Sequence, residues 1–461
     1  MIEGYLNMVR RFLPSPFSIA LILTLFSFLL AFALEVHGGG SISLAKTFGW
    51  WSDGLWNAPM LVFAMQMMLM LVLGHSLALT SVVDSIIQRL VSHCHSTSQA
   101  AVIVSLSALV VGLFNWGLGL IFGAIFARKV GESLSAKKIP LNYALIGAAG
   151  YSALLIWHAG ISGSAPIKVA EQGNLQLLMS GVLTSESLSL LPERIELMDT
   201  VFSSSNMITC VVILICIPLT LYLLGRTSKK HEIIQLSVFD VLVESKDTKP
   251  VGAERIDKSK WVTRITGSII LAYCFYKMIL GGTSILDFFT PNNINLILFG
   301  ASLWLHASFE SFTKSIETAI SGASGILIQF PIYFGIMGLI KESGMVTSIS
   351  DQFVLLSNDT TFPIFSFLSA GLVNIFIPSG GGQWVIQGPI LIKAAIELNI
   401  PFGKTVMALA YGDQITNMLQ PFWALPLLGI TKLSAKDILP YTLIMFFVGF
   451  IIYFASLLLL F

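Results

Sequence analysis

Uncharged apolar stretches recur along the whole of this 461-residue chain. A helix that crosses the hydrocarbon layer of a membrane needs about 20 apolar residues, and most of these stretches reach or exceed that length. They include residues 17–34, 54–83, 142–167, 318–340 and 438–461. Helices of soluble proteins keep a polar face, so uncharged runs of this length are typical of membrane spans. The pattern therefore predicts an all-α polytopic membrane protein.

The distribution of Lys and Arg predicts how these spans are oriented, because cytoplasmic loops carry an excess of both residues. Segment 226–260 carries eight of them, and we expect it to be a cytoplasmic linker in a protein whose N-terminus is also cytoplasmic. The predicted units are a first membrane repeat (1–225), the linker (226–260), a connecting helix (261–281) and a second membrane repeat (282–461).

The two membrane halves match each other at a nearly constant offset. The matched positions are Gln66 with Gln329, Gly117 and Gly119 with Gly380 and Gly382, and Ile139-Pro140 with Ile400-Pro401. Because the halves have opposite predicted orientations, the match indicates two inverted repeats, which in transporters meet at a binding site near the membrane midplane. Each repeat is predicted to hold a re-entrant hairpin (99–128 and 362–398) and a broken helix (142–167 and 403–430). The alternative is that unrelated apolar segments resemble one another by composition.

Polar and glycine-rich interruptions mark four points within these spans. They are Asn115–Gly119, Gly160–Ser164, Ser379–Gln383 and Asp413–Asn417, the last followed by Gln420-Pro421. Three consecutive glycines disfavour a continuous helix, since each costs about 1 kcal/mol relative to Ala, and irregular backbone at membrane depth must face protein or water. The helix after each hairpin turn presents free N–H groups and the positive end of its dipole. We therefore expect these interruptions to bind a small carboxylate.

The expected substrate-binding residues combine glycines, which let a ligand approach the backbone, with side-chain hydrogen-bond donors. They are Asn115, Gly117, Gly119, Ser162, Ser164, Ser379, Gly380, Gly381, Gly382, Gln383 and Trp384. The alternative for the small residues is that they only allow helices to pack closely.

Asp413 is the one acidic residue that lies within the apolar part of a predicted crossing. An ionised Asp at the bilayer centre costs about 2.5–3.5 kcal/mol on insertion scales, and no Lys or Arg is nearer in sequence than Lys404. Burial then favours the protonated acid, which suits a proton carrier. The expected ion- or proton-coupling residues are Asp413, Gln414, Thr416, Asn417 and His158. In the alternatives, Asp413, Thr416 and Asn417 bind Na⁺, Asp413 caps a broken helix, or His158 is a hydrogen-bonded core residue.

Composition argues against several other classes. Only 11% of the residues are charged and the net charge is +1, so no basic surface for nucleic acid is expected. His93-Cys94-His95 lacks a second pair at metal-ligand spacing and is expected to be a polar loop. The sequence has no His-Glu-x-x-His or Gly-x-Ser-x-Gly motif, which argues against the hydrolases that use them. No cofactor is implied apart from a Na⁺ ion.

Nearly the whole chain resembles the short-chain fatty acid transporter family, the bacterial type that takes up acetoacetate and butyrate. The densest matches are Asn115–Arg128 (NWGLGLIFGAIFAR), Gly325–Phe334 (GILIQFPIYF), Pro378–Pro389 (PSGGGQWVIQGP) and Met407–Pro426 (MALAYGDQITNMLQPFWALP). The chain departs from the family pattern at Gln383, Asp413 and His158, where His, Glu and Gly are familiar.

That family is similar, more distantly, to the ion transporter superfamily, whose members are dimers with two re-entrant hairpins and an elevator-like moving domain. The resemblance implies a homodimeric elevator-type transporter in the bacterial inner membrane, in contact with lipid. The hairpins and broken helices would form the moving domain. The scaffold and dimer contact would be formed by the helices at 16–35, 202–225, 292–309 and 438–460.

The sequence thus predicts a secondary active transporter that imports short-chain fatty acids or related monocarboxylates, of the butyrate or acetoacetate type, coupled to H⁺ or Na⁺. One alternative is a sodium-coupled dicarboxylate carrier, which is disfavoured because no Arg or Lys lies at the interruptions. Another is an intramembrane enzyme that processes acyl groups or lipids, which would need Ser162 or Ser164 to meet His158 in space. A passive channel is disfavoured because no helix carries a continuous polar face.

Overall fold

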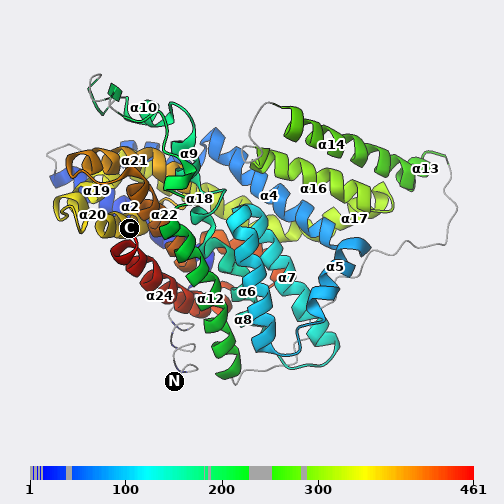
Figure 1. The fold of residues 1–461 in the computed structure, drawn as a ribbon. Helices are drawn as coiled ribbons and strands as arrows, with labels where there is room; N and C mark the ends of the chain where they lie inside the picture. Colours follow the sequence, from blue (N-terminus) through cyan, green and yellow to red (C-terminus); the bar gives the residue numbers. More distant parts are fainter. Residues whose placement is uncertain are drawn as a thin grey trace.

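The computed structural model describes residues 14–37, 44–180, 191–227, 252–281 and 288–461, together with a few isolated positions outside these ranges. The described residues fold almost entirely into helices (Figure 1), and seven helical segments among them are long and apolar enough to cross a membrane. The predicted all-α polytopic fold is confirmed. Residues 228–251 of the predicted linker lie outside the described residues.

The first half runs from two N-terminal helices through a helix hairpin to an interrupted helix and a final long helix. Its elements are α2 (Pro16–His37), α3 (Leu44–Leu55), α4 (Ala58–Ala78), α5 (Ser81–Val91), α6 (Thr97–Phe114), α7 (Trp116–Ala136), α8 (Tyr143–Tyr151), the 3₁₀ turns η1 (Ser152–Leu155) and η2 (Trp157–Ala159), α9 (Ser164–Ala170), α10 (Asn174–Met179), the 3₁₀ turn η3 (Leu197–Asp199) and α12 (Ser204–Thr227).

The second half begins with a pair of helices at the edge of the molecule and then follows the same plan. Its elements are α13 (Glu254–Asp257), α14 (Lys260–Leu280), α16 (Pro291–Leu305), α17 (Phe309–Ile320), η4 (Ser321–Ala323), α18 (Ser324–Glu342), α19 (Met345–Leu355), α20 (Phe362–Phe376), α21 (Gly380–Glu397), α22 (Phe402–Thr416), η5 (Asn417–Leu419), α23 (Pro421–Thr431) and α24 (Ala435–Leu459). The connecting segment 261–281 is thus helical throughout almost its whole length.

The same succession of elements occurs in both halves. A long helix (α4, α18) leads to a helix of 11 residues (α5, α19), a hairpin (α6–α7, α20–α21), a helix interrupted by 3₁₀ turns and a final long helix (α12, α24). This order agrees with the internal repeat expected from the matched sequence positions. The opposite orientation of the two copies across a membrane stays a prediction.

The structure moves two of the four expected interruptions. Gly380–Gly382 form the first turn of α21 rather than a non-helical turn, because the side chain of Ser379 caps the helix by accepting a hydrogen bond from Gly382 N. The N–H groups in the first turn of a helix have no partners within the helix. The cap satisfies one of them and so offsets part of the conformational cost of placing glycines in a helix. Asp413 likewise lies in the last turn of α22, so the helix is interrupted only in the later part of the expected stretch, at Asn417–Gln420.

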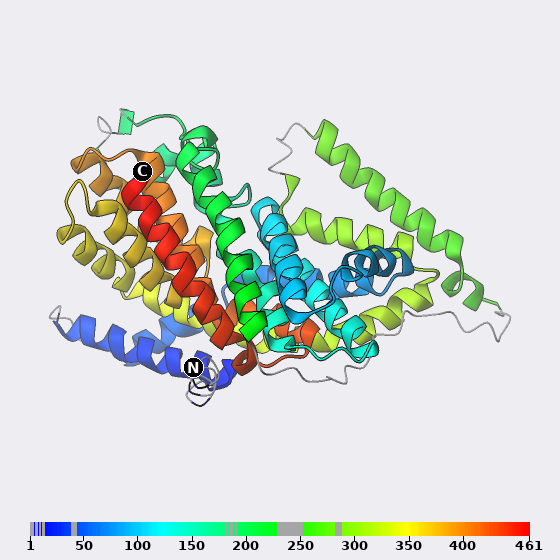
Figure 2. The same cartoon turned by 60° about the horizontal axis from the view of Figure 1, so that its bottom comes forward.

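The final helices of the two halves pack against each other and against the interrupted helices. Figure 2 shows α12 and α24 side by side, and α12 also packs on α6 while α24 packs on α8 and η5. The helix pair α14–α16 extends away at the opposite end of the molecule (Figure 1). Segments 202–225 and 438–460 thus pack against the hairpins and interrupted helices, and the division into a scaffold and a moving domain stays a prediction.

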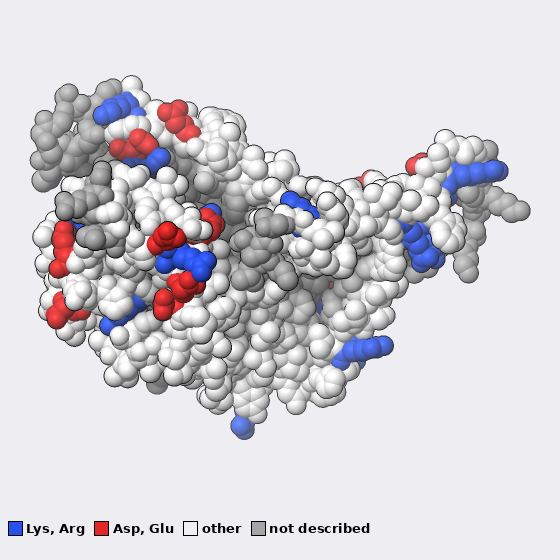
Figure 3. Space-filling view, turned by 45° about the horizontal axis from the view of Figure 1, so that its top comes forward, with Lys and Arg blue, Asp and Glu red and all other residues white. Residues whose placement is uncertain are grey.

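The surface carries wide uncharged areas between groups of charged side chains (Figure 3). Large apolar side chains are exposed on α2, α12 and α14, including Leu29, Ile215 and Ile269. Exposed apolar area on this scale is unfavourable in water and is the normal outer surface of a helix in lipid. The surface thus agrees with the multi-pass membrane fold.

Candidate functional site

The two interrupted helices meet at a buried His–Asp pair. His158 on η2 and Asp413 on α22 are separated by 255 positions, yet His158 Nδ1 lies 2.5 Å from Asp413 Oδ2 and both side chains are buried. The other ring nitrogen, Nε2, accepts a hydrogen bond from the backbone N–H of Ala165 at 3.0 Å. Because an acceptor nitrogen carries no proton, the ring proton lies on Nδ1, which donates to Asp413 Oδ2.

The backbone around His158 is held by side chains from two other helices. Gln414 Oε1 accepts hydrogen bonds from the backbone N–H groups of His158 and Ala159, at 2.8 and 3.2 Å. Asn206 on α12 donates to the Ala159 carbonyl, and the Tyr411 hydroxyl donates to Asn206 Oδ1. These bonds satisfy 3₁₀ backbone that would be costly to bury otherwise, and they fix the position of the His158 ring.

A second polar centre lies beside this pair, around Asn374 on α20. Asn374 Nδ2 lies 2.6 Å from the Asp413 carbonyl, 2.9 Å from Thr416 Oγ1 and 3.2 Å from Asn417 Oδ1. The three residues expected to bind Na⁺ therefore do converge, but Asp413 contributes its backbone oxygen and an amide nitrogen stands at the centre. Asn374 was missed in the sequence because it lies in an apolar stretch with no polar neighbour to mark it.

The tip of the second hairpin rests against the His–Asp pair. A Cβ atom at Gly380 would lie 2.8 Å from His158 Cε1, 2.8 Å from the Trp157 ring and 3.3 Å from Asp413 Oδ2. Contacts under 3.0 Å are closer than real Cβ atoms make, so position 380 has no room for a larger residue. The glycine is thus needed for close approach of the α21 N-terminus to the pair.

Two adjoining cavities lie at the hairpin tips. The outer cavity, of about 350 Å³, is lined by Phe114, Asn115, Trp116, Ile161, Ser162, Gly163, Ser164, Ile167, Lys168, Glu171, Phe289, Thr290, Pro291 and Gly381. The smaller one, of about 70 Å³, which we call the aromatic chamber, is lined by Phe63, Trp116, Leu154, Trp157, Ser164, Ser379, Gly380, Gly381 and Trp423. Trp116, Ser164 and Gly381 line both cavities and form the boundary between them.

Six of the expected substrate-binding residues line one or both cavities. They are Asn115, Ser162, Ser164, Ser379, Gly380 and Gly381. Within this group Ser162 Oγ accepts a hydrogen bond from Trp116 N at 3.0 Å, which ties the tip of the first hairpin to the interruption in the following helix.

The other five expected residues point elsewhere. Gly117 packs on Met70, Gly119 on Gly112 and Gly382 near the Ser379 cap, and Trp384 covers Gly388. Gln383 donates to the Ala370 carbonyl and to Gln387 Oε1, inside the hairpin. These positions sit on helix faces that turn toward neighbouring helices, and the sequence pattern could not distinguish those faces from the cavity face.

Two charged residues that the sequence reasoning left out also line the outer cavity. Lys168 and Glu171 flank the cavity and form an ion pair of 2.7 Å at the surface. Lys168 lies four residues after the second interruption and reaches the outer cavity from α9. An exposed ion pair of this kind contributes little to stability, and its charge is already balanced by its partner.

The contacts of His158 also bear on the enzyme alternative. Its two ring nitrogens bind Asp413 and the Ala165 amide, so neither is directed at Ser162 or Ser164. The geometry does not supply the nucleophile–base pair that the alternative required.

Comparison with known proteins places the chain in a family. The model of the short chain fatty acid transporter family matches residues 2–460. The chain belongs to this family. It is 36% identical over 441 residues to a protein of Escherichia coli (strain K12) named "Putative short-chain fatty acid transporter", covering 94% of this chain and 93% of that protein. It is 34% identical over 439 residues to a protein of the same name from Haemophilus influenzae, with the same coverage.

Two solved structures are also similar to this member of the short-chain fatty acid transporter family. The YdaH transporter of Alcanivorax borkumensis is 16% identical, with a TM-score of 0.42 and coverage of 96% of this chain and 98% of that one. MtrF of Neisseria gonorrhoeae is 13% identical, with a TM-score of 0.42 and coverage of 98% and 97%. The family and the curated relatives are transporters and not enzymes, as the sequence predicted.

Proposed function

We propose that this protein is a secondary active transporter that imports short-chain monocarboxylates, of the butyrate or acetoacetate type, across the bacterial inner membrane together with H⁺. The observation that carries the proposal is the contact between the α21 tip at Gly380 and the buried pair of His158 and Asp413. One face of that tip lines the aromatic chamber, so the substrate site and the titratable pair share a single stretch of backbone.

The substrate carboxylate binds at the start of α21. This helix has 18 residues, and its first N–H groups and dipole favour an anion. The hydroxyl groups of Ser164 and Ser379 lie in the wall of the same chamber. Trp157, which is only 5% exposed, also lines it, and its Nε1–H has no hydrogen-bond partner among the described residues. A buried donor without a partner is costly, and a bound carboxylate would satisfy it.

The site suits one carboxylate better than two. Lys168 is the only Lys or Arg that lines either cavity within the described residues, and it is already paired with Glu171. The carboxylate would be held by neutral donors, which is sufficient for a monoanion. The dicarboxylate alternative finds no second cationic position here.

Electrostatic repulsion would couple the binding of a proton to the binding of the substrate. An ionised Asp413 beside a bound carboxylate places two negative charges in a poorly hydrated region, and this repulsion favours binding of a proton to the pair. The proton goes to Asp413, because the Ala165 amide occupies His158 Nε2. Substrate anion and proton then cross together without net charge.

The test is uptake by the purified full-length protein in proteoliposomes. Labelled acetate, butyrate and acetoacetate are supplied while the pH gradient and the Na⁺ gradient are imposed separately. We expect an inward pH gradient without Na⁺ to drive accumulation. Absence of uptake of all three acids under every gradient would contradict the proposal.

A Na⁺-coupled version is the second candidate, and it is favoured by the oxygens around Asn374. Asn374 Oδ1 and Gln420 Oε1 are buried without partners among the described residues, and three further oxygens surround Asn374 Nδ2. Movement of this amide would leave an oxygen-rich position of the kind that hard cations prefer. Accumulation driven by Na⁺ alone in the same assay would select this candidate.

Transport would proceed by the elevator movement of a homodimer. The packing of α12 and α24 on the hairpins and interrupted helices supports a single moving body that includes these two helices. The N-terminus and the 226–260 linker would lie in the cytoplasm, and lipid would cover the exposed apolar side chains.

A further inference from the structure

The aromatic chamber has two chemically different sides. On the polar side, the Ser164 side chain is the nearest neighbour of Gly381, and the Trp157 ring lies against Gly380. On the apolar side, the rings of Phe63, Trp116 and Trp423 contact one another. Their centroids are 6.1 Å apart for Phe63–Trp116, 6.1 Å for Phe63–Trp423 and 5.2 Å for Trp116–Trp423. A carboxylate bound on the polar side therefore points its tail at an aromatic wall.

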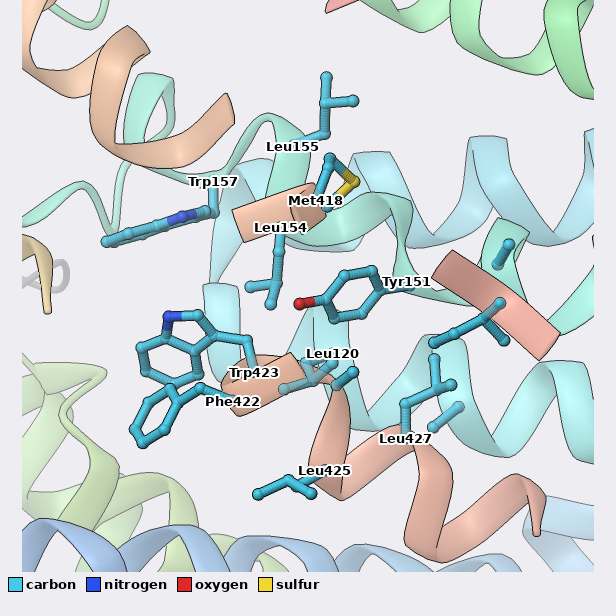
Figure 4. Close-up of a cluster of buried hydrophobic side chains, with 14 of the residues drawn as sticks. Leu120, Tyr151, Leu154, Leu155, Trp157, Met418, Phe422, Trp423, Leu425 and Leu427 are labelled. Carbon is cyan, nitrogen blue, oxygen red and sulfur yellow. The ribbon is translucent and has the colours of Figure 1, made fainter. Parts of the chain in front are cut away.

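This wall is supported from behind by a second layer of rings. Phe330 stacks on Phe63 at 6.3 Å and on Phe422 at 4.0 Å, and Tyr333 meets Phe422 edge-on at 4.9 Å. The three residues of this layer are almost fully buried. Figure 4 shows the rings of Phe422 and Trp423 next to each other, with Trp157 facing them. Close-packed interiors resist displacement, so the far end of the chamber is fixed.

We infer that Phe63 and Trp423 set the upper limit on the acyl chain length of the substrate, an inference that rests on the proposed function. The chamber is small, about 70 Å³ in volume. Phe63 and Trp423 line the chamber together with Gly380 and Gly381, so a tail that is too long for the chamber would meet their rings.

Phe63 is the better position for a test because it lies on α4, outside the hairpins and interrupted helices that hold the carboxylate. The experiment compares uptake of labelled acetate, butyrate and hexanoate by the full-length protein in proteoliposomes. Phe63→Ala enlarges the chamber and Phe63→Trp reduces it. Phe447→Ala is the matched control, because Phe447 lies on α24 and is 55% exposed.

Phe63→Ala is expected to raise the ratio of hexanoate to butyrate uptake by about fourfold for each methylene that the enlarged chamber accepts, the factor that corresponds to burying one CH₂ group. Phe63→Trp is expected to lower butyrate uptake relative to acetate. Phe447→Ala is expected to keep the wild-type profile. Size-exclusion chromatography in detergent verifies that each variant is folded.

An unchanged chain-length profile in both folded Phe63 variants would overturn the inference while leaving the proposed function intact. If a Phe63 variant does not fold, Trp423→Leu enlarges the chamber at the same wall. A raised ratio of hexanoate to butyrate uptake is again expected, and an unchanged ratio would again overturn the inference. If the wild-type protein takes up none of the acids, the proposed function itself fails. The two failures are therefore distinguishable.

Discussion

Gly380 lies directly against the imidazole ring of His158, so close that a Cβ atom at position 380 would stand 2.8 Å from His158 Cε1. Gly380 begins the helix whose N-terminus lines the aromatic chamber, and His158 holds the carboxylate of Asp413. In the proposed function, the bound substrate and the coupling pair would thus be separated only by the backbone of Gly380. A displacement of the hairpin tip would change the surroundings of both at once.

Replacing Gly380 with Ala adds only one methyl group but should reduce transport strongly. The added methyl group would overlap the rings of His158 and Trp157, and overpacking of this kind costs about 1–3 kcal/mol. We expect butyrate uptake in proteoliposomes to fall by about tenfold, which corresponds to about 1.4 kcal/mol. Gly49→Ala is the control, because a Cβ at Gly49 meets nothing within 4 Å. Equal uptake by both variants would show that the close contact of Gly380 with His158 and Trp157 is not needed for transport.

The Asp413→Asn variant should separate accumulation from exchange. The amide oxygen of Asn can still accept the hydrogen bond from His158 Nδ1, so the packing is kept while the exchangeable proton is lost. We expect accumulation driven by a pH gradient to disappear, while exchange of internal for external labelled butyrate remains in part. Accumulation to the wild-type level would remove Asp413 from the coupling mechanism.

Loss of the His158 ring should destabilise the fold. The His158→Ala variant leaves the Ala165 amide without its acceptor, and an orphaned buried donor costs roughly 1–3 kcal/mol. We expect a lower midpoint of thermal unfolding in detergent. His93→Ala, at an exposed loop position, should leave the midpoint unchanged. Matching midpoints in the two variants would mean that His158 contributes nothing to the stability of the broken helix.

An Asn374→Asp substitution tests the oxygen-rich centre. It replaces the amide nitrogen by an oxygen that faces the Asp413 carbonyl, Thr416 Oγ1 and Asn417 Oδ1, so the protein should unfold at a lower temperature in choline buffer. Addition of Na⁺ should restore part of the loss, because a cation can replace the donor at the centre of four oxygens.

The control for that experiment is Asn292→Asp, which alters an amide paired with Gln66 near the surface. Its thermal midpoint should not depend on Na⁺. If Na⁺ affects neither variant, the centre around Asn374 is a structural hydrogen-bond cluster and the Na⁺-coupled candidate loses its support.

Local sequence was sufficient for the membrane helices and the two hairpins. Their signals are the length of apolar runs and the cap residues: Asn115 and Ser379 each begin the second helix of a hairpin and accept a hydrogen bond from its N–H groups. Local sequence was less reliable for the exact positions at which the helices are interrupted. Glycines at 380–382 suggested irregular backbone, but a single cap makes a helical first turn there, and Asp413 continues α22 for one turn more than expected.

By itself the sequence determined that this is a helical membrane protein with polar interruptions, since helix length and capping depend on neighbours in the chain. Only the tertiary structure decided which polar groups meet. His158 pairs with Asp413 across 255 positions, Asn374 gathers three oxygens, and Gln383 turns away from the cavities into its own hairpin. The reason is that contacts between distant segments depend on the rotation and packing of whole helices, which no local pattern of residues specifies.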